Sequence, residues 1–231
     1  MQQFFVRANE ALYQDLSEYA NVLRTIAQAL PKAKASCEQA VREARLVQAL
    51  IAFGSGPQII ELSRLTLHLG NLWGVRDDLP ARATGFGPQL EESVRARDLA
   101  AAGLKLASQR EQDALSAELR VCFTNMIEHL HEQERLLKEC DELIQPFRTS
   151  PELTRKRLAL LIAAAEARLP DTPARNSTIA TYREADQLLA EWSGGVTLDE
   201  AGIGTLERCL EIIRASSETF GILAVVVREE E

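Results

Sequence analysis

One unusually long stretch of this chain carries no residue that would interrupt a helix. From Gln89 to Gln145 there is no proline and a single glycine, Gly103. A helix rises about 1.5 Å per residue, so these roughly 57 residues could form one helix about 85 Å long. The sequence therefore predicts a long, coiled-coil-like helix over about residues 89–145.

The second half of this stretch carries a heptad stripe. Its apolar residues recur alternately four and three positions apart, which is the spacing of the contact positions in a coiled coil. Another helix has to cover such a stripe, and the pattern fits a partner helix from the same chain as well as one from a dimer. We take six of its residues as the candidate interaction seam: Leu119, Phe123, Met126, Leu130, Leu137 and Ile144.

The composition favours an all-α protein. Aromatic residues are only 5% of the 231 residues, whereas the helix-favouring Ala, Leu, Glu and Arg recur throughout. A hydrophobic share of 46% is enough for a core that needs neither metal nor disulfides. We expect an elongated helical bundle with one long helix and a smaller C-terminal helical subdomain.

Periodicity and breakers define the helices before the long stretch. A stripe from Phe5 to Leu30 predicts a first amphipathic helix, which Pro31 ends or kinks. A second stripe of mostly small residues over Ala33–Ile51 predicts another helix, and Gly54 can take the C-terminal capping position after it. The segment Ile59–Trp73 is expected to form a third helix, although its leucines also alternate as in a strand.

Prolines mark the boundary between the two expected domains. Pro146 and Pro151 follow the long stretch, and a proline at the second of these positions suits the first turn of a new helix. We expect a helical bundle over residues 1–147, which includes the long helix, and a C-terminal helical hairpin or small bundle over residues 150–231.

The charge argues against general attraction to nucleic acid or anionic lipid. The net charge is −8, whereas both kinds of binding draw on clustered lysine and arginine. The basic triplet Arg155-Lys156-Arg157 is interpreted as a solvated helix face. The longest strongly apolar run, Phe220 to Val227, is too short to span a bilayer, and no signal peptide is visible. We expect no transmembrane segment and a cytoplasmic location.

The four cysteines are far apart in the sequence. Cys37, Cys122, Cys140 and Cys209 form no Cys-x-x-Cys pair, and two of them fall in or beside apolar stripe positions. We interpret all four as buried thiols in a reducing compartment.

Candidate catalytic and metal-binding groups are all incomplete. Glu128-x-x-His131 has the spacing found in di-iron carboxylate bundles, but such a site needs a second Glu-x-x-His and further carboxylates. The pair Asp77-Asp78 is interpreted as a loop cap, and Glu139 with Glu142 as surface charge. We therefore expect no catalytic residues, no metal site and no cofactor, and hence a protein that is not an enzyme.

The sequence predicts a role in protein–protein contact. We expect an adaptor, scaffold or assembly subunit that acts through helix–helix contacts with a protein partner or a second copy, and a homo-oligomer. Two alternatives stay open. One is a helical sensor that binds a small ligand near His129, Trp73 or Trp192, and the other is a membrane-surface or filament-forming helical protein.

Overall fold

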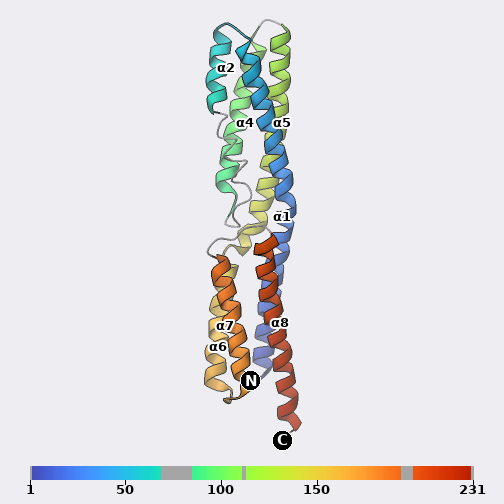
Figure 1. Cartoon of the computed structure of the whole chain (residues 1–231), viewed down its shortest axis with the longest axis vertical. Helices are drawn as coiled ribbons and strands as arrows, with labels where there is room; N and C mark the ends of the chain where they lie inside the picture. Colours follow the sequence, from blue (N-terminus) through green and yellow to red (C-terminus); the bar gives the residue numbers. More distant parts are fainter. Residues whose placement is uncertain (1, 69–84, 111–112, 194–199, 230–231) are drawn as a thin grey trace. The chain divides into compact units, whose positions relative to one another are not determined.

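The computed structural model describes residues 2–68, 85–110, 113–193 and 200–229, and within them every regular element is helical (Figure 1). The predicted all-α class and its bundle architecture are confirmed. The helices are α1 (Gln2–Ala52), α2 (Pro57–His68), α4 (Gly87–Ser108), α5 (Ala114–Ile144), the short 3-10 helix η1 (Gln145–Phe147), α6 (Ser150–Arg168), α7 (Pro173–Ser193) and α8 (Glu200–Glu229). No described helix is long and apolar enough to cross a membrane.

The chain folds as two compact units, and α1 contributes to both. The terminal unit combines α1 up to Thr25 with the chain from Ile144 onward, whereas the central unit holds the described residues from Ile26 to Leu143. The expected division into residues 1–147 and 150–231 is therefore wrong at the N-terminus. An apolar stripe shows that a helix must be covered but not which helices cover it, and the first half of α1 is covered by helices from the other end of the chain.

In the terminal unit, the first half of α1 packs with α6, α7 and α8. Ion pairs link α1 to α6 through Asp15 and Arg157, and to α8 through Arg24 and Glu207. The Tyr182 hydroxyl on α7 donates a buried 2.6 Å hydrogen bond to Asn9 Oδ1 on α1. Short connections make α6, α7 and α8 successive antiparallel neighbours, as in a four-helix bundle.

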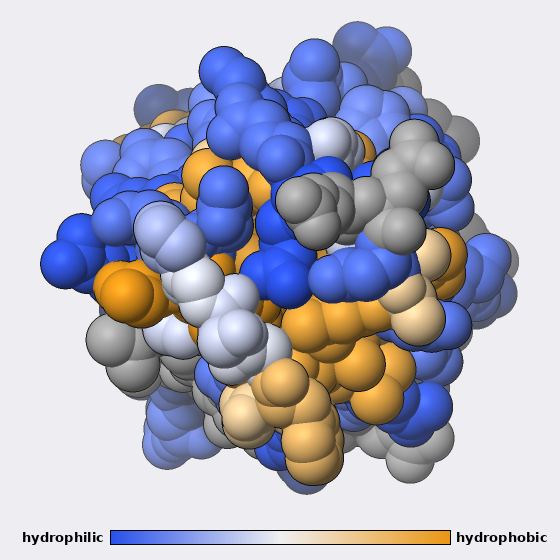
Figure 2. Space-filling view, turned by 90° about the horizontal axis from the view of Figure 1, so that it is seen from above, coloured by the Kyte–Doolittle hydropathy of each residue, from blue (hydrophilic) through white to orange (hydrophobic). Residues whose placement is uncertain are grey.

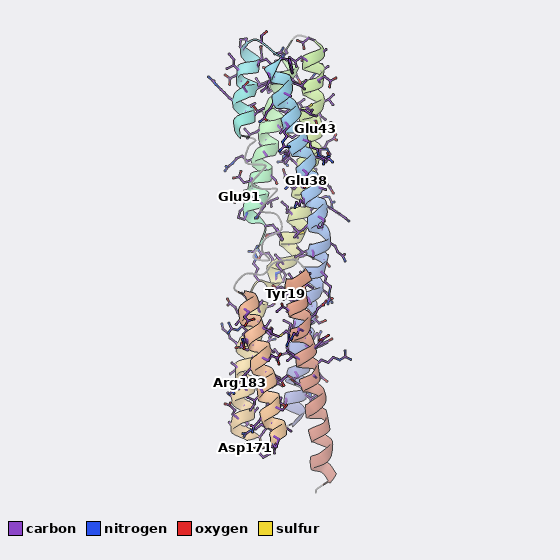
Figure 3. All side chains as sticks on the ribbon, in the orientation of Figure 1. Tyr19, Glu38, Glu43, Glu91, Asp171 and Arg183 are labelled. Atoms are coloured by element: carbon purple, nitrogen blue, oxygen red, sulfur yellow. The ribbon has the colours of Figure 1, made fainter. Side chains whose placement is uncertain are left out.

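The ring of Tyr19, labelled in Figure 3, also belongs to this packing. It stacks on the ring of Phe147 in η1, with 6.0 Å between their centroids. Burial raises the pKa of the Tyr19 phenol well above its ordinary value, because the charged phenolate is poorly solvated there. Tyr19 is thus a neutral core residue at the point where η1 meets α1.

In the central unit, the second half of α1 packs with α2, α4 and α5. Asn125 on α5 donates a 3.3 Å hydrogen bond to Glu43 on α1, a residue labelled in Figure 3. The backbone N–H of Phe86, just before α4, donates to Asp141 near the end of α5 over 2.9 Å. This second contact places the start of α4 beside the end of α5, so these two helices are antiparallel.

The predicted long helix over residues 89–145 is wrong, because the chain reverses between α4 and α5. Asp113 accepts a 2.6 Å hydrogen bond from the backbone N–H of Ser116, as the first residue before a helix typically does. The Ser116 hydroxyl donates to the carbonyl of Ala107 at the end of α4 over 2.8 Å. A polar cap thus turns the chain without the proline or glycine on which the prediction relied.

Helix α1 runs through Pro31 rather than ending there. The side chain of Pro31 is exposed, whereas the stripe residues on either side of it, Leu30 and Ala33, are buried. All residues of the predicted first and second stripes are buried. The two expected helices are one helix, because α1 is continuous from Gln2 to Ala52. Helix α2 confirms the third expected helix as far as His68, and the rest of that prediction lies outside the described residues.

Candidate protein-binding groove

The predicted interaction seam lies inside the protein. All six seam residues are 0% exposed, and the ring of Phe123 lies against Gly103 on α4. The chain itself therefore covers the stripe, which answers the question of internal or external pairing that the sequence left open. The residues that form core in this way are Leu119, Phe123, Met126, Leu130, Leu137 and Ile144. A surface that contacts a partner therefore has to be sought on other residues.

An open apolar groove lies between α1 and α6 in the terminal unit. A hollow of about 440 Å³ is bordered mainly by apolar side chains, and it adjoins a smaller hollow of about 210 Å³ nearer η1. Both hollows are bordered by Asp15 and Arg157. We call this surface the α1/α6 groove, and its lining includes Phe4, Ala8, Ala11, Leu12, Asp15 and Glu18 on α1, and Leu153, Arg157, Leu160 and Leu161 on α6.

Large apolar side chains of the groove stand in solvent. Phe4 is 57% exposed, Leu153 47% and Leu160 70%. Helix α6 buries Leu158 and Leu161 on its inner face, whereas its outer side carries Leu153 and Leu160 among charged residues such as Glu152 and Lys156. Large apolar side chains that are exposed next to a hollow often mark a contact surface. The outer side of α6 is therefore a candidate contact surface.

An ion pair crosses the groove. Arg157 Nη1 donates to Asp15 Oδ2, and both side chains are about half exposed. The neighbouring Arg155 pairs with Asp186 on α7 instead. Two members of the basic triplet thus bind carboxylates within the terminal unit, and the third, Lys156, is exposed. Exposed pairs of this kind add little stability by themselves but fix the direction of an approaching partner.

The central unit also exposes apolar residues. Figure 2, seen from above, shows a contiguous apolar patch beside hydrophilic residues. Phe53 is 88% exposed in the turn after α1, and Ile60 on α2 is 58% exposed. A shallow hollow on α4 is bordered by Leu90, Val94 and Leu99 together with charged side chains. Phe53 and Ile60 are single exposed apolar residues, which are normal on a protein surface, and they do not line this hollow. The hollow on α4 is the larger of the two, about 670 Å³, but its lining residues lie on one helix, whereas the α1/α6 groove lies between two.

Several buried polar groups of the central unit lie between α4 and α5. Gln133 is 0% exposed, and neither of its amide atoms has a hydrogen-bond partner in the described part of the chain. Ser93 is also buried, and its hydroxyl has no partner among the described residues. Arg97 donates a 2.5 Å hydrogen bond to Glu134, whose other carboxylate oxygen has no partner within the same described ranges. Such groups cost stability in a core but can fix which helix register is formed.

Glu134 predicts a pH dependence of stability. Burial raises the pKa of its carboxyl, although Arg97 acts in the opposite direction. The folded protein thus holds this proton more tightly than the unfolded chain does. The stabilising contribution is complete below the ordinary pKa of 4.5 and is lost as the pH rises through the raised value. In urea unfolding, we expect the stability of the wild type relative to Glu134→Gln to fall as pH rises, and a rise would contradict this.

All four cysteines are confirmed as buried. Burial raises the pKa of Cys122 and of Cys140 to about 11, and that of Cys209 to about 12. A reactive cysteine requires the thiolate, which these values make rare near neutral pH.

We expect all four thiols to react slowly with Ellman's reagent near pH 8 in the native protein, and all four to react rapidly in concentrated urea. Both experiments use the same reagent concentration, so that only the accessibility and ionisation of the thiols differ. Rapid native reaction of any of the four would contradict the packing described here.

The candidate metal and catalytic residues do not come together. Among the residues whose side chains are described, no group of three His, Cys, Asp or Glu side chains is placed to hold a metal ion. Glu132 and Glu139 each bind Arg135, which lowers the pKa of the Glu132 carboxyl. Asp77 and Asp78 lie outside the described residues. Glu132 and Glu139 on the polar face of α5 thus form local ion pairs with Arg135.

Sequence reasoning missed the groove, although a signal was present. In the α6 segment, Leu158, Leu161 and Ala165 recur at helical spacing, whereas Leu153 and Leu160 fall outside that stripe. Two leucines on the opposite side of an amphipathic helix indicate a second contact surface.

Comparisons with protein-family models, with curated proteins and with solved structures found no match.

Proposed function

We propose that this protein is a non-enzymatic assembly or scaffold subunit that binds a protein partner at the α1/α6 groove. The observation that carries the proposal is the exposure of Phe4 and Leu160 on opposite walls of one apolar hollow. Helix-in-groove recognition uses such surfaces, with an apolar helix face laid between two helices. Covering these side chains would contribute about 25 cal/mol for each Å² of apolar surface removed from water.

The proposal gives a contact role to α6 rather than to α5. The seam residues from Leu119 to Leu137 are buried in the central unit. We therefore place the partner surface on the terminal unit instead. The cytoplasmic location and the homo-oligomer expected from the sequence stay predictions.

The ligand-sensor alternative rests on His129, Trp73 and Trp192, and the side chains of the two tryptophans lie outside the described residues.

Photo-crosslinking tests the proposal. A benzophenone amino acid is placed at Leu160 in one variant and at Ile60 in a control variant, because Ile60 is similarly exposed but lies on the central unit. We expect illumination in cells to yield a discrete protein adduct from position 160 and a much weaker one from position 60. Equal yields from the two positions, or no adduct from position 160, would contradict a partner at the groove.

A further inference from the structure

We propose that the occupant of the α1/α6 groove is a second copy of this chain, related to the first by a twofold axis that runs along the groove. This inference rests on the proposed function, because it names the partner of the same surface. Two helices border the groove side by side, so an axis along it places α1 of one copy over α6 of the other. Each contact then occurs twice, as in any isologous dimer.

The sizes of the groove residues suit this arrangement. On α1, the small residues Ala8 and Ala11 line the hollow beside the large Phe4, and on α6 the large, exposed Leu160 lines it. The two helices run antiparallel, since Asp15 meets Arg157 while residues nearer the N-terminus of α1 share the hollow with Leu160. A rotation about this twofold axis leaves the position of each residue along the groove unchanged. Leu160 of each copy is thereby brought over the alanines of the other, a large residue over small ones.

The charges suit it as well. Asp15 and Glu18 are acidic groups on the α1 side, and Arg157 is the basic group on the α6 side. With the axis along the groove, each Asp15 also approaches Arg157 of the second copy, and the two ion pairs form a square of alternating charges. An axis across the helices would instead stack α1 on α1 and α6 on α6, with acid facing acid and arginine facing arginine. Opposite charges across an interface select orientation in this way.

A second copy also explains why both members of each complementary pair lie on one surface. If the partner were a different protein, the partner's surface alone would have to fit the groove. The groove would then have no need to fit the groove of a second copy. Here a large apolar residue lies beside small ones, and an acid lies beside a base, within the same hollow. Self-complementarity of this kind is what a closed twofold dimer requires.

Disulfide trapping between two single-cysteine-addition variants tests the inference. Tagged Ala11→Cys protein is mixed with untagged Leu160→Cys protein under mild oxidation, so that only a bond between copies joins the two species. The native cysteines do not interfere because they are buried. The control mixture pairs the same Ala11→Cys protein with Ile60→Cys. Circular dichroism of each variant confirms that it is folded.

We expect the mixed disulfide between positions 11 and 160 to form at least about tenfold faster than the control disulfide, which corresponds to about 1.4 kcal/mol. A rate equal to the control would overturn the twofold arrangement. The photo-crosslinker at Leu160 separates this failure from failure of the proposed function. An adduct with a different protein would keep the groove as a binding site and overturn the second copy, whereas no adduct would overturn both.

Discussion

Replacing Gly103 by valine is expected to lower the free energy of unfolding of the central unit by about 3 kcal/mol. A Cβ atom at this position of α4 would lie 2.3 Å from Cε1 of Phe123. The Phe123 ring is fully buried, so it cannot swing into solvent to make room. The missing side chain of Gly103 is what lets α4 approach α5 at this level, and a larger residue has to push the helices apart.

Gly204→Ala is the matched control for this prediction. Gly204 also lies within a helix, but a Cβ atom there would meet nothing within 4 Å. Alanine favours a helix over glycine by about 1 kcal/mol, so this variant should be slightly more stable than the wild type. Urea unfolding followed by circular dichroism measures both. A neutral Gly103→Val variant would contradict the close packing of α4 on α5.

Replacing Pro31 by alanine is expected to raise the free energy of unfolding by about 2 kcal/mol. A proline inside a helix lacks the N–H that would bond to the carbonyl four residues earlier, that of Ala27, and costs about 3 kcal/mol. Proline also restricts the unfolded chain, and losing that restriction offsets up to about 1 kcal/mol. Because the Pro31 side chain is exposed, its removal takes no contact from the core.

The control for Pro31 is another exposed position one turn away. Gln28→Ala should change the stability by less than about 0.5 kcal/mol, because Gln28 is exposed and alanine only improves helix propensity slightly. Thermal and urea unfolding of the two variants are compared under the same conditions. A Pro31→Ala variant that is no more stable than Gln28→Ala would contradict the expected cost of this proline in α1.

Periodicity predicted which residues are buried more reliably than which helices pack together. The stripes from Phe5 to Ile51 and from Leu119 to Ile144 are buried, as their spacing indicates. The covering helices could not be deduced, because any amphipathic helix of suitable length satisfies the same pattern. For this reason the first half of α1 was assigned to the wrong unit.

Helix ends were predicted well where proline or glycine marks them and poorly elsewhere. The start of α6 at Ser150, beside Pro151, was predicted correctly. The reversal before Asp113 was not, because its cap uses an aspartate and a serine that also occur within helices. Pro31 shows the converse error. A strong stripe on both sides kept α1 helical through a residue that usually ends a helix.

The candidate site depended on information that the sequence holds only weakly. Leu160 is one of several leucines in α6, and only the structure separates it from the buried Leu158 and Leu161. The opposite wall of the groove, at Phe4 and Ala8, lies about 150 residues away in the chain. Long-range pairing of this kind follows from the packing of α1 on α6, which the stripes alone do not specify.

Self-association is tested by the molar mass of the protein from light scattering, measured over a concentration series for the wild type and for Leu160→Asp. We expect the wild-type mass to rise with concentration from 25.6 kDa toward twice that value. The variant should stay monomeric, because its new carboxylate would be buried in the groove contact without a partner. A wild type that remains at the monomer mass at every concentration would contradict self-association through the α1/α6 groove.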